Sequence, residues 1–415
     1  MRESLGPSFV ILALGLGSGE VILWPYLVSN YGLGIAWGAL LGITFQYFIN
    51  MEIERYALAK GESVFVGLKR IFKFAPYWFI FSTFVGFGLP GIVAASAQVM
   101  AAVLGLANFK YLAIFFLILI GFILSSGRTV YGLMEKITMS ILLVGVPFIF
   151  ILAIIFGTVD GWFNLLKGII GRGDGYNFLP AGISLATFLA AFTYSGAGGN
   201  LNLTQSIYIK EKGYGMGKYA QKITGLFRGK SKEQNIKLSG EDFVVNKENI
   251  SRFKRWWRMI SIEHLLVFWL MGSLSMLFLM VLAYGTAYGV FGNAQGIHFV
   301  LNEGVIIGQK SLSFIGGLFL VAVSIMLFQT QLGIADSTSR IMSENFALRR
   351  LSDDSRNVNL GKIYYIFVWA QIAFGVLLFL FNIYEPKSLI ILGAVINAVA
   401  MFVHIGLVAV LNHKS

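Results

Sequence analysis

Ten long apolar stretches divide this chain, and most of them run for 18 residues or more. A helix needs roughly 20 apolar residues to cross the hydrocarbon core of a bilayer. Only 13% of the residues are charged, whereas a soluble domain carries about 25%. We therefore expect an all-α polytopic membrane protein whose spans cover residues 7–31, 34–57, 76–105, 110–126, 133–157, 179–208, 259–286, 312–340, 361–382 and 387–411.

The basic residues fall mainly on one side of these spans. If the N-terminus is cytoplasmic, 27 of the 32 Lys and Arg lie inside, and the five outside are Lys110, Lys167, Arg172, Lys310 and Lys387. This is the positive-inside pattern, so we expect both termini in the cytoplasm and the chain in the cell (plasma or inner) membrane. The net charge of +12 then reflects topology, and we expect a lipid bilayer, not nucleic acid, as partner of a monomeric chain.

Two glycine runs interrupt the first and sixth apolar stretches, at residues 15–20 (GLGSGE) and 195–200 (SGAGGN). A broken helix in lipid is tolerated only where it lines a protein cavity. Matching breaks in two halves of a chain are typical of a transporter's binding site. The simpler alternative is that the glycines only allow close helix packing.

The breaks imply an organisation of five spans plus five. We expect a first repeat at residues 1–157, an outer interfacial segment at 158–178, and a second repeat at 179–411. The second repeat would contain a cytoplasmic loop at 210–258. Residues 252–258 (RFKRWWR), at the end of this loop, are typical of an anchor at the membrane interface.

Each break offers backbone N–H groups and carbonyls that an intact helix would have used. Glu20 is the most informative side chain, because a carboxylate at mid-bilayer is costly unless it is paired, hydrated or protonated. We expect it to bind a cation, carry a proton or cap a half-helix. The candidate binding residues are Gly17, Ser18, Gly19, Glu20, Tyr194, Ser195, Gly196, Ala197, Gly198, Gly199, Asn200, Gln329 and Asn397.

A few further residues carry local predictions. Asp336 and Arg340 are four residues apart and should pair, and residues 52–55 should form ion pairs at the inner end of the second span. Pro90 and Pro147 should each kink a helix.

Known catalytic signatures are missing from the sequence. It contains no HExxH motif, nucleophile elbow, P-loop or dinucleotide-binding fingerprint, so we expect no enzymatic activity and no cofactor beyond a bound cation or coupling ion. Secondary transport by alternating access is the expected function. A channel is the alternative class, but channels usually show repeated pore loops, and none is visible in the sequence.

Parts of the sequence resemble the Nramp (natural resistance-associated macrophage protein) family of divalent-metal transporters. Residues 6–9 (GPSF) match the family's Gly-Pro-x-Phe, and residues 31–33 (YGL) its Tyr-Gly-Tyr. Residues 329–331 (QTQ) and 343–346 (SENF) are similar to its Gln-Ser-Ser and Met-Glu-Gly-Phe. The resemblance implies a five-plus-five inverted repeat of the leucine-transporter type, with helices 1 and 6 broken.

The family's metal ligands are replaced here. Its Asp-Pro-Gly-Asn aligns with residues 17–20, which puts Gly17 at the metal-binding Asp, and its Met-Pro-His falls near residues 198–200. A metal held by Glu20 and neutral oxygens would be a hard ion such as Mg²⁺, Mn²⁺ or Ca²⁺. Residues 17–19 also resemble the Gly-Ser-Gly of amino-acid/polyamine transporters, whose backbone N–H groups hold a carboxylate. We expect a hard divalent metal cation as the cargo, with an amino acid or other small organic solute held by the Gly-Ser-Gly backbone as the alternative.

Overall fold

Helices build almost the whole of the described structure, as the apolar stretches predict. The computed structural model describes residues 6–126, 130–173, 175–219, 238–241, 243–350 and 359–414. In chain order its elements are α1 (Pro7–Gly15), η1 (Gly19–Leu23), α2 (Trp24–Tyr31), η2 (Leu33–Ile35), α3 (Ala36–Lys60), α4 (Val64–Ile71), α5 (Ala75–Phe87), α6 (Gly91–Val103), α7 (Lys110–Ser126), α8 (Val130–Phe156), α9 (Val159–Ile169), β1 (Arg172–Gly173), β2 (Tyr176–Asn177), α10 (Leu185–Thr193), η3 (Gly199–Leu203), α11 (Thr204–Lys212), η4 (Gly215–Tyr219), α12 (Lys247–His264), η5 (Leu265–Met271), α13 (Gly272–Thr286), α14 (His298–Lys310), α15 (Ser313–Arg350), α16 (Leu360–Leu380) and α17 (Pro386–Lys414).

The ten expected spans are all found as helices or broken helices. Within the described ranges, eight are long and apolar enough to cross a membrane. A ninth, α7, is shorter, and the sixth is split into α10 and α11. The expected outer interfacial segment contains α9 and a two-stranded hairpin of β1 and β2. Part of the expected cytoplasmic loop, residues 220–237, lies outside the described residues.

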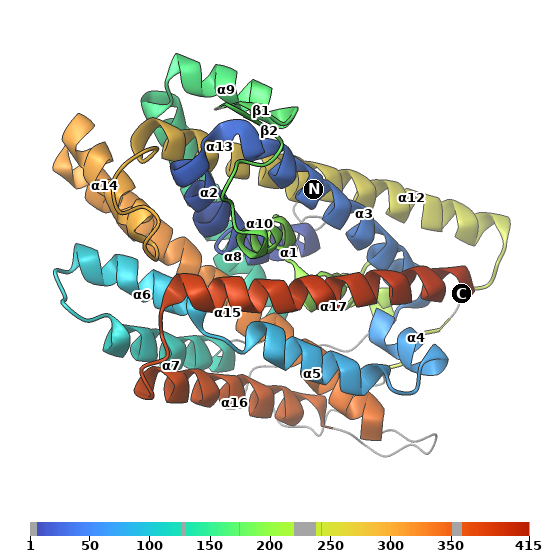
Figure 1. Ribbon diagram of the computed structural model, residues 1–415. Helices are drawn as coiled ribbons and strands as arrows, with labels where there is room; N and C mark the ends of the chain where they lie inside the picture. Colours follow the sequence, from blue (N-terminus) through green and yellow to red (C-terminus); the bar gives the residue numbers. More distant parts are fainter. Residues whose placement is uncertain are drawn as a thin grey trace.

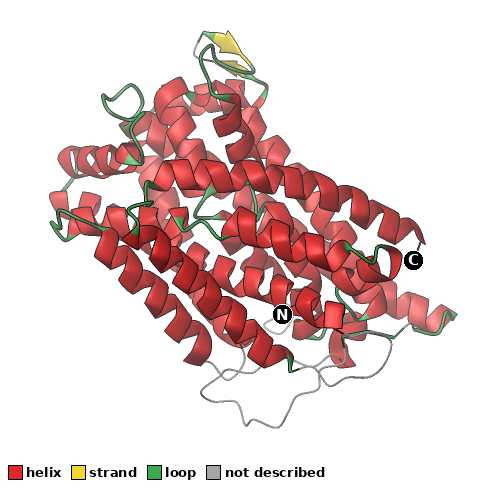
Figure 2. Ribbon diagram, turned by 60° about the horizontal axis from the view of Figure 1, so that its bottom comes forward, coloured by secondary structure: helices red, strands yellow, loops and turns green. Residues whose placement is uncertain are grey.

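The two ends of the bundle carry different elements. In Figure 1, α14 and the turn between α6 and α7 lie at the left, with α9 and the hairpin at the upper left. The C-terminus and the start of α12 lie at the right. Figure 2 shows the same helical bundle turned by 60°. The segments that we expect on the outer side of the membrane therefore lie away from the C-terminus.

The first span is the most enclosed. Its apolar window is 94% buried, whereas that of Tyr131–Phe156, in α8, is only 33% buried. Helices α8, α16 and α17 therefore present apolar side chains outward, where lipid would cover them, while the first span is surrounded by other helices.

The two glycine runs interrupt their helices in different ways. In the first span α1 ends at Gly15, residues 16–18 form a turn, and the π-helix η1 follows. Leu16 and Ser18 keep right-handed helical dihedrals, so this span is distorted without being opened. In the sixth span the chain leaves the helix between α10 and η3, where Gly198 (φ 72°) and Gly199 (φ 50°) adopt left-handed conformations that favour glycine.

Proline creates a third interruption, in the third span. Helix α5 ends at Phe87 and α6 begins at Gly91, immediately after Pro90. The predicted kink is thus confirmed as a break. Pro147 lies inside α8, which continues through it.

The two interrupted spans pack directly against each other. A Cβ on Gly15 would lie 2.7 Å from the carbonyl carbon of Gly196, and a Cβ on Gly19 would overlap the carbonyl oxygen of Tyr194. On another side of the span, a Cβ on Gly17 would overlap the Thr330 hydroxyl oxygen. Close packing is therefore one function of both glycine runs.

We expect Gly19→Ala to destabilise the protein by about 3 kcal/mol or more, because the new methyl group would overlap backbone that cannot rotate away. Gly317→Ala is the matched control: it also lies in a helix, but a Cβ there meets nothing within 4 Å. The control should change stability by less than about 1 kcal/mol. Unfolding of the purified protein by heat or denaturant measures both, and equal effects would contradict the packing described here.

A buried carboxyl lies outside the spans, in α14. Burial raises the pKa of Glu303 from 4.5 to about 8, although a hydrogen bond with Thr286 at the end of α13 opposes the shift. A raised carboxyl pKa means that the folded protein binds more protons than the unfolded chain between these two values. Stability should therefore fall as the pH rises from 4.5 to about 8.

Glu303→Gln should remove this part of the pH dependence, because an amide does not ionise. Melting temperatures of wild type and variant across that pH range measure the effect. Parallel curves for the two proteins would contradict the prediction.

Candidate functional site

All thirteen candidate residues are buried. Those of the sixth span meet the first, third and tenth spans at the centre of the bundle. Glu20 and Gln329 point to other neighbours and are described separately below.

Tyr194 and Asn397 form the core of this central region. The Asn397 amide donates to the Tyr194 hydroxyl and to the Gly86 carbonyl, both at 2.9 Å. That carbonyl is available because Pro90, four residues later, has no N–H to donate to it. Phe87 stacks on the Tyr194 ring, with 6.2 Å between the ring centroids. The Asn397 side chain therefore connects the third, sixth and tenth spans.

Asn200 joins the same region to α5. Its amide donates to the hydroxyls of Ser82 (2.8 Å) and Thr83 (3.0 Å). The side-chain oxygens of Asn200 and Asn397 are buried and have no hydrogen-bond partner among the described residues. Buried polar atoms are nearly always paired, so these two oxygens are exceptions among the described residues. We refer to Tyr194, Asn200 and Asn397 as the polar centre.

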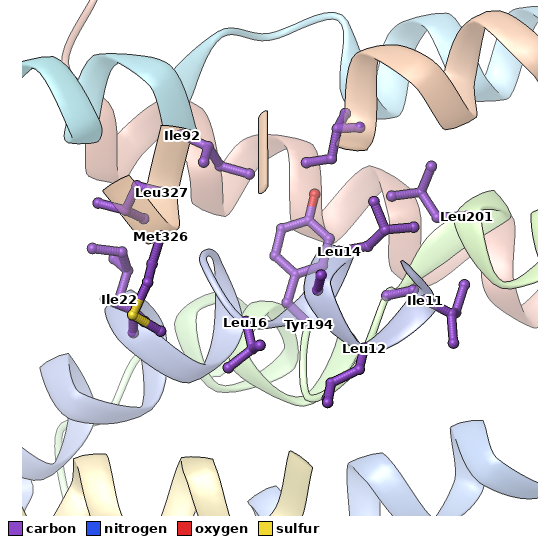
Figure 3. Close-up of a cluster of buried hydrophobic side chains, with 14 of the residues drawn as sticks. Ile11, Leu12, Leu14, Leu16, Ile22, Ile92, Tyr194, Leu201, Met326 and Leu327 are labelled. Carbon is purple, nitrogen blue, oxygen red and sulfur yellow. The ribbon is translucent and has the colours of Figure 1, made fainter. Parts of the chain in front are cut away.

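The polar centre is closed in this structure. A cavity of about 10 Å³ lies beside Tyr194, between Phe87, Gln331 and Ile390, which is close to the least volume that holds one water molecule. Figure 3 shows the Tyr194 ring among aliphatic side chains of the first span, such as Leu14 and Leu16. A solute larger than water would therefore need movement of the spans around this cavity.

Gln46, in α3, stabilises the break of the sixth span and was not predicted. Its amide nitrogen donates to the Thr193 carbonyl (2.9 Å), and its amide oxygen accepts from the Gly198 N–H (2.9 Å). One side chain thus supplies both the donor and the acceptor that the missing helical turn would have provided. The sequence could have identified it, because Gln46, Asn50 and Glu54 follow one another at intervals of four residues along an apolar span. Residues at this spacing share one face of a helix.

The distorted turn of the first span is satisfied in a similar way. The Thr330 hydroxyl, in α15, donates to the Ala13 carbonyl (3.0 Å). The Trp24 indole donates to the Ser195 hydroxyl (3.0 Å), which joins the two breaks. In this conformation the Gly198 N–H is therefore paired, and the Ala13 and Thr193 carbonyls each accept one hydrogen bond.

Glu20 points away from the polar centre, toward the second and seventh spans. Its Oε1 lies 3.6 Å from where a Cβ on Gly272 would stand, and the side chains of Leu12 and Ile43 border the same place. Glu20 is 0% exposed, and neither carboxylate oxygen has a hydrogen-bond partner within the described ranges. Gly272 directly follows the π-helix η5, and Glu20 itself lies in the π-helix η1. Such π-helical turns occur frequently at functional sites.

Two other predictions concern side chains of α15. Gln329 donates to the Thr138 hydroxyl of α8 at 3.2 Å, whereas Gln331 lines the central cavity. The predicted Asp336–Arg340 pair is confirmed, with both carboxylate oxygens 2.9 Å from the arginine Nε.

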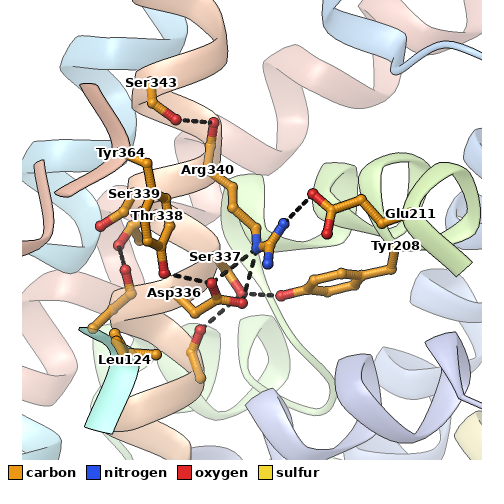
Figure 4. Close-up of polar contacts among 12 residues, drawn as sticks. Leu124, Tyr208, Glu211, Asp336, Ser337, Thr338, Ser339, Arg340, Ser343 and Tyr364 are labelled. Carbon is orange, nitrogen blue, oxygen red and sulfur yellow. Dashed lines mark hydrogen bonds and ion pairs between the residues drawn. The ribbon is translucent and has the colours of Figure 1, made fainter. Parts of the chain in front are cut away.

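Arg340 is the centre of an ionic network at the end of the bundle that we expect to face the cytoplasm (Figure 4). Its guanidinium also binds Glu211 of α11 at 2.5 Å. Tyr364 donates to Asp336 (2.7 Å), and Tyr208 shares a hydrogen bond of 2.6 Å with the Ser337 hydroxyl. These contacts join the sixth span to the eighth and ninth. We call Tyr208, Glu211, Asp336, Arg340 and Tyr364 the inner network.

More ion pairs surround the inner network. Lys210 lies 3.6 Å from Glu344, and Lys212 lies 2.5 Å from Glu135 of α8. The ion pairs predicted for residues 52–55 are also found. Arg55 pairs with Glu52 at 2.6 Å on the surface, while Glu54 lies 3.1 Å from the His264 ring in the interior.

A metal site cannot be recognised from clustered side chains. The part of the chain that the structure describes holds no group of three or more His, Cys, Asp and Glu residues that could bind a metal ion. A cation at Glu20 would therefore depend on one carboxylate together with backbone or hydroxyl oxygens.

Comparisons with known proteins support the fold. No family model and no curated protein matches the sequence. The structure is similar to a manganese transporter of Eremococcus coleocola in complex with an aromatic bis-isothiourea compound, with a TM-score of 0.66, 10% identity, and coverage of 98% of this chain and 78% of that one. A variant of that transporter gives a TM-score of 0.68 at 10% identity, covering 97% and 77%.

Mhp1, a nucleobase-cation-symport-1 transporter in a closed conformation with bromovinylhydantoin bound, is also similar. Its TM-score is 0.56 at 12% identity, with coverage of 93% of this chain and 74% of that chain. At these identities the likeness shows the fold alone. The chain is an all-α polytopic membrane protein of the leucine-transporter fold.

We expect Gln46→Leu to destabilise the protein by about 2–5 kcal/mol, because it leaves a buried N–H and a buried carbonyl unpaired at the break. Gln309→Leu, at an exposed position of α14, is the control and should have little effect. Denaturant unfolding measures both. A neutral Gln46→Leu would show that the break is stable without this side chain.

Proposed function

We propose that this protein is a secondary transporter that moves a small solute across the membrane by alternating access. The observation that carries the proposal is the direct contact of two interrupted spans beside an enclosed polar centre. Interrupted helices with buried, unpaired acceptors at mid-membrane fit a solute site better than a structural core. The shared fold with known transporters supports the same conclusion.

The contacts that would open and close the path lie at the two ends. At the inner end, the inner network holds the sixth span to the eighth. At the outer end, Lys387 of α17 lies 4.7 Å from the centre of the Tyr26 ring and donates to the Ala294 carbonyl at 2.6 Å. Access from one side requires loss of one set of contacts while the other remains.

The cargo that the polar centre favours is a small organic solute with N–H or O–H donors. Its unpaired groups are the amide oxygens of Asn200 and Asn397, which accept hydrogen bonds and carry no net charge. Tyr194 and Phe87 add an aromatic wall.

The second candidate cargo is a hard divalent cation, as expected from the resemblance to Nramp transporters. It is favoured by the two unpaired carboxylate oxygens of Glu20. The aliphatic neighbours Leu12 and Ile43 favour a different role for Glu20, as the residue that carries the coupling cation or a proton.

Ligand screening by thermal shift distinguishes the two cargoes. Mg²⁺, Mn²⁺, Ca²⁺, amino acids and nucleobases would each be added to the purified protein, and a ligand at 100 times its Kd stabilises by about 2.7 kcal/mol. We expect a shift with an organic solute. A shift with divalent ions alone would reject the organic cargo in favour of the metal.

We expect Glu20→Gln to abolish the dependence of solute uptake on an ion gradient in proteoliposomes, because an amide can neither take up a proton nor neutralise a cation. The fold should be retained, since the change removes a buried charge. Glu303→Gln is the matched control, a buried carboxyl in an outer helix, and should transport normally. Unchanged ion dependence in Glu20→Gln would refute the coupling role, and single-channel currents would refute the transporter.

A further inference from the structure

A stripe of polar side chains runs along one face of the second span. Gln46, Asn50 and Glu54 are spaced four residues apart in α3, so they lie on the same side of the helix, and each is 0% exposed. Polar side chains inside membrane spans are rare and usually functional. The stripe begins at the break of the sixth span, where Gln46 binds, and leads toward the inner ends of the first and seventh spans.

The inner end of the stripe is a buried carboxylate–imidazole pair. Glu54 Oε1 lies 3.1 Å from His264 Nδ1, and both side chains are 0% exposed. The Gln205 amide donates to the same carboxylate oxygen at 2.6 Å, and the Ser8 hydroxyl lies 3.1 Å from His264 Nδ1. The pair therefore connects the first, second, sixth and seventh spans.

Aromatic rings fix the orientation of His264. Tyr47 stacks on the imidazole with 5.6 Å between ring centroids, and Phe268 stacks on it at 4.7 Å. With the ring held in this way, Nδ1 faces Glu54, and Nε2 is directed away from it. The position of a proton on each ring nitrogen is thus set by the packing.

Several polar atoms along the stripe lack partners. Both amide atoms of Asn50, Oε2 of Glu54, Oε1 of Gln205 and Nε2 of His264 are buried without a hydrogen bond to any described residue. Buried polar atoms that lack a protein partner are normally hydrogen-bonded to ordered water. A row of such atoms beside an ionisable pair is the arrangement that proton transfer requires, because water can then link one group to the next.

We propose that Glu54 and His264 form a proton-binding site, linked by the polar stripe of α3 to the break of the sixth span. With His264 neutral and Glu54 ionised, the pair carries one negative charge. Binding of one proton at Nε2 gives an imidazolium beside the carboxylate, with no net charge, and release of that proton restores the first state. Use of this site in coupling rests on the proposed transport function.

Another buried carboxyl lies beside the pair. Glu263 is next to His264 in the chain, and its Oε1 accepts from the Gly6 and Ser8 N–H groups. The other titratable groups facing this region are Tyr47, Tyr131, Tyr214 and the Lys212–Glu135 ion pair.

The site is tested by histidine-selective ¹⁵N NMR of the full chain in nanodiscs, with His264→Asn to assign the signal. We expect the His264 ring to gain one proton as the pH is lowered between about 8 and 5. In Glu54→Gln the midpoint should move to lower pH by about one unit or more, because the carboxylate no longer stabilises the imidazolium. His404 is the internal control, since it is also 0% exposed but no carboxylate is found paired with it among the described residues.

A purely structural pair gives a different result. If His264 keeps one protonation state across this pH range in the wild type, or titrates identically in Glu54→Gln, the proposal is overturned. The wild-type titration alone shows whether His264 changes its protonation state, even if the Glu54→Gln variant does not fold. The experiment needs no solute, so its failure is separate from failure of the transport assay with Glu20→Gln.

Discussion

The contact between the first and sixth spans is the constraint on which the rest of the structure depends. Gly15 and Gly19 bring the first span against Gly196 and the Tyr194 carbonyl, at a place where both helices have lost part of their regular hydrogen bonding. In lipid, every freed backbone group needs another partner. Gln46 and Thr330 supply those partners, so the polar residues of the second and eighth spans follow from the breaks.

Much of this arrangement could be predicted from the sequence. Span length, the glycine runs, the break at Pro90 and the Asp336–Arg340 pair depend on local chemistry, and the structure confirms them. The side of the first span on which Glu20 lies could not be predicted. Such a prediction assumes 3.6 residues per turn, and the π-helix η1 departs from this periodicity. Likewise, Gln329 and Gln331 are equivalent by composition, and only the packing of α15 decides which one lines the cavity.

The buried charges are distributed unevenly. The polar centre contains neutral side chains, whereas the inner network gathers Glu211, Asp336 and Arg340 within one connected set of contacts. Removing one partner of a buried ion pair leaves an uncompensated charge, which costs several kcal/mol. If the sixth and eighth spans separate at this network, as the proposed transport cycle requires, water must solvate all of these groups together, so the opening would be cooperative.

The seventh span continues as a single helix from Lys247 to Thr286, a length of 40 residues, whereas the interfacial anchor at residues 252–258 was expected to precede it. At 1.5 Å per residue such a helix is about 60 Å long, twice the roughly 30 Å of a bilayer's hydrocarbon core. Its first part projects beyond the bundle (Figure 1) and carries Arg252, Arg255 and Arg258 on its exposed surface. Because such a helix is longer than the hydrocarbon core, these three cations would lie at the depth of the lipid headgroups, where anionic lipids attract them.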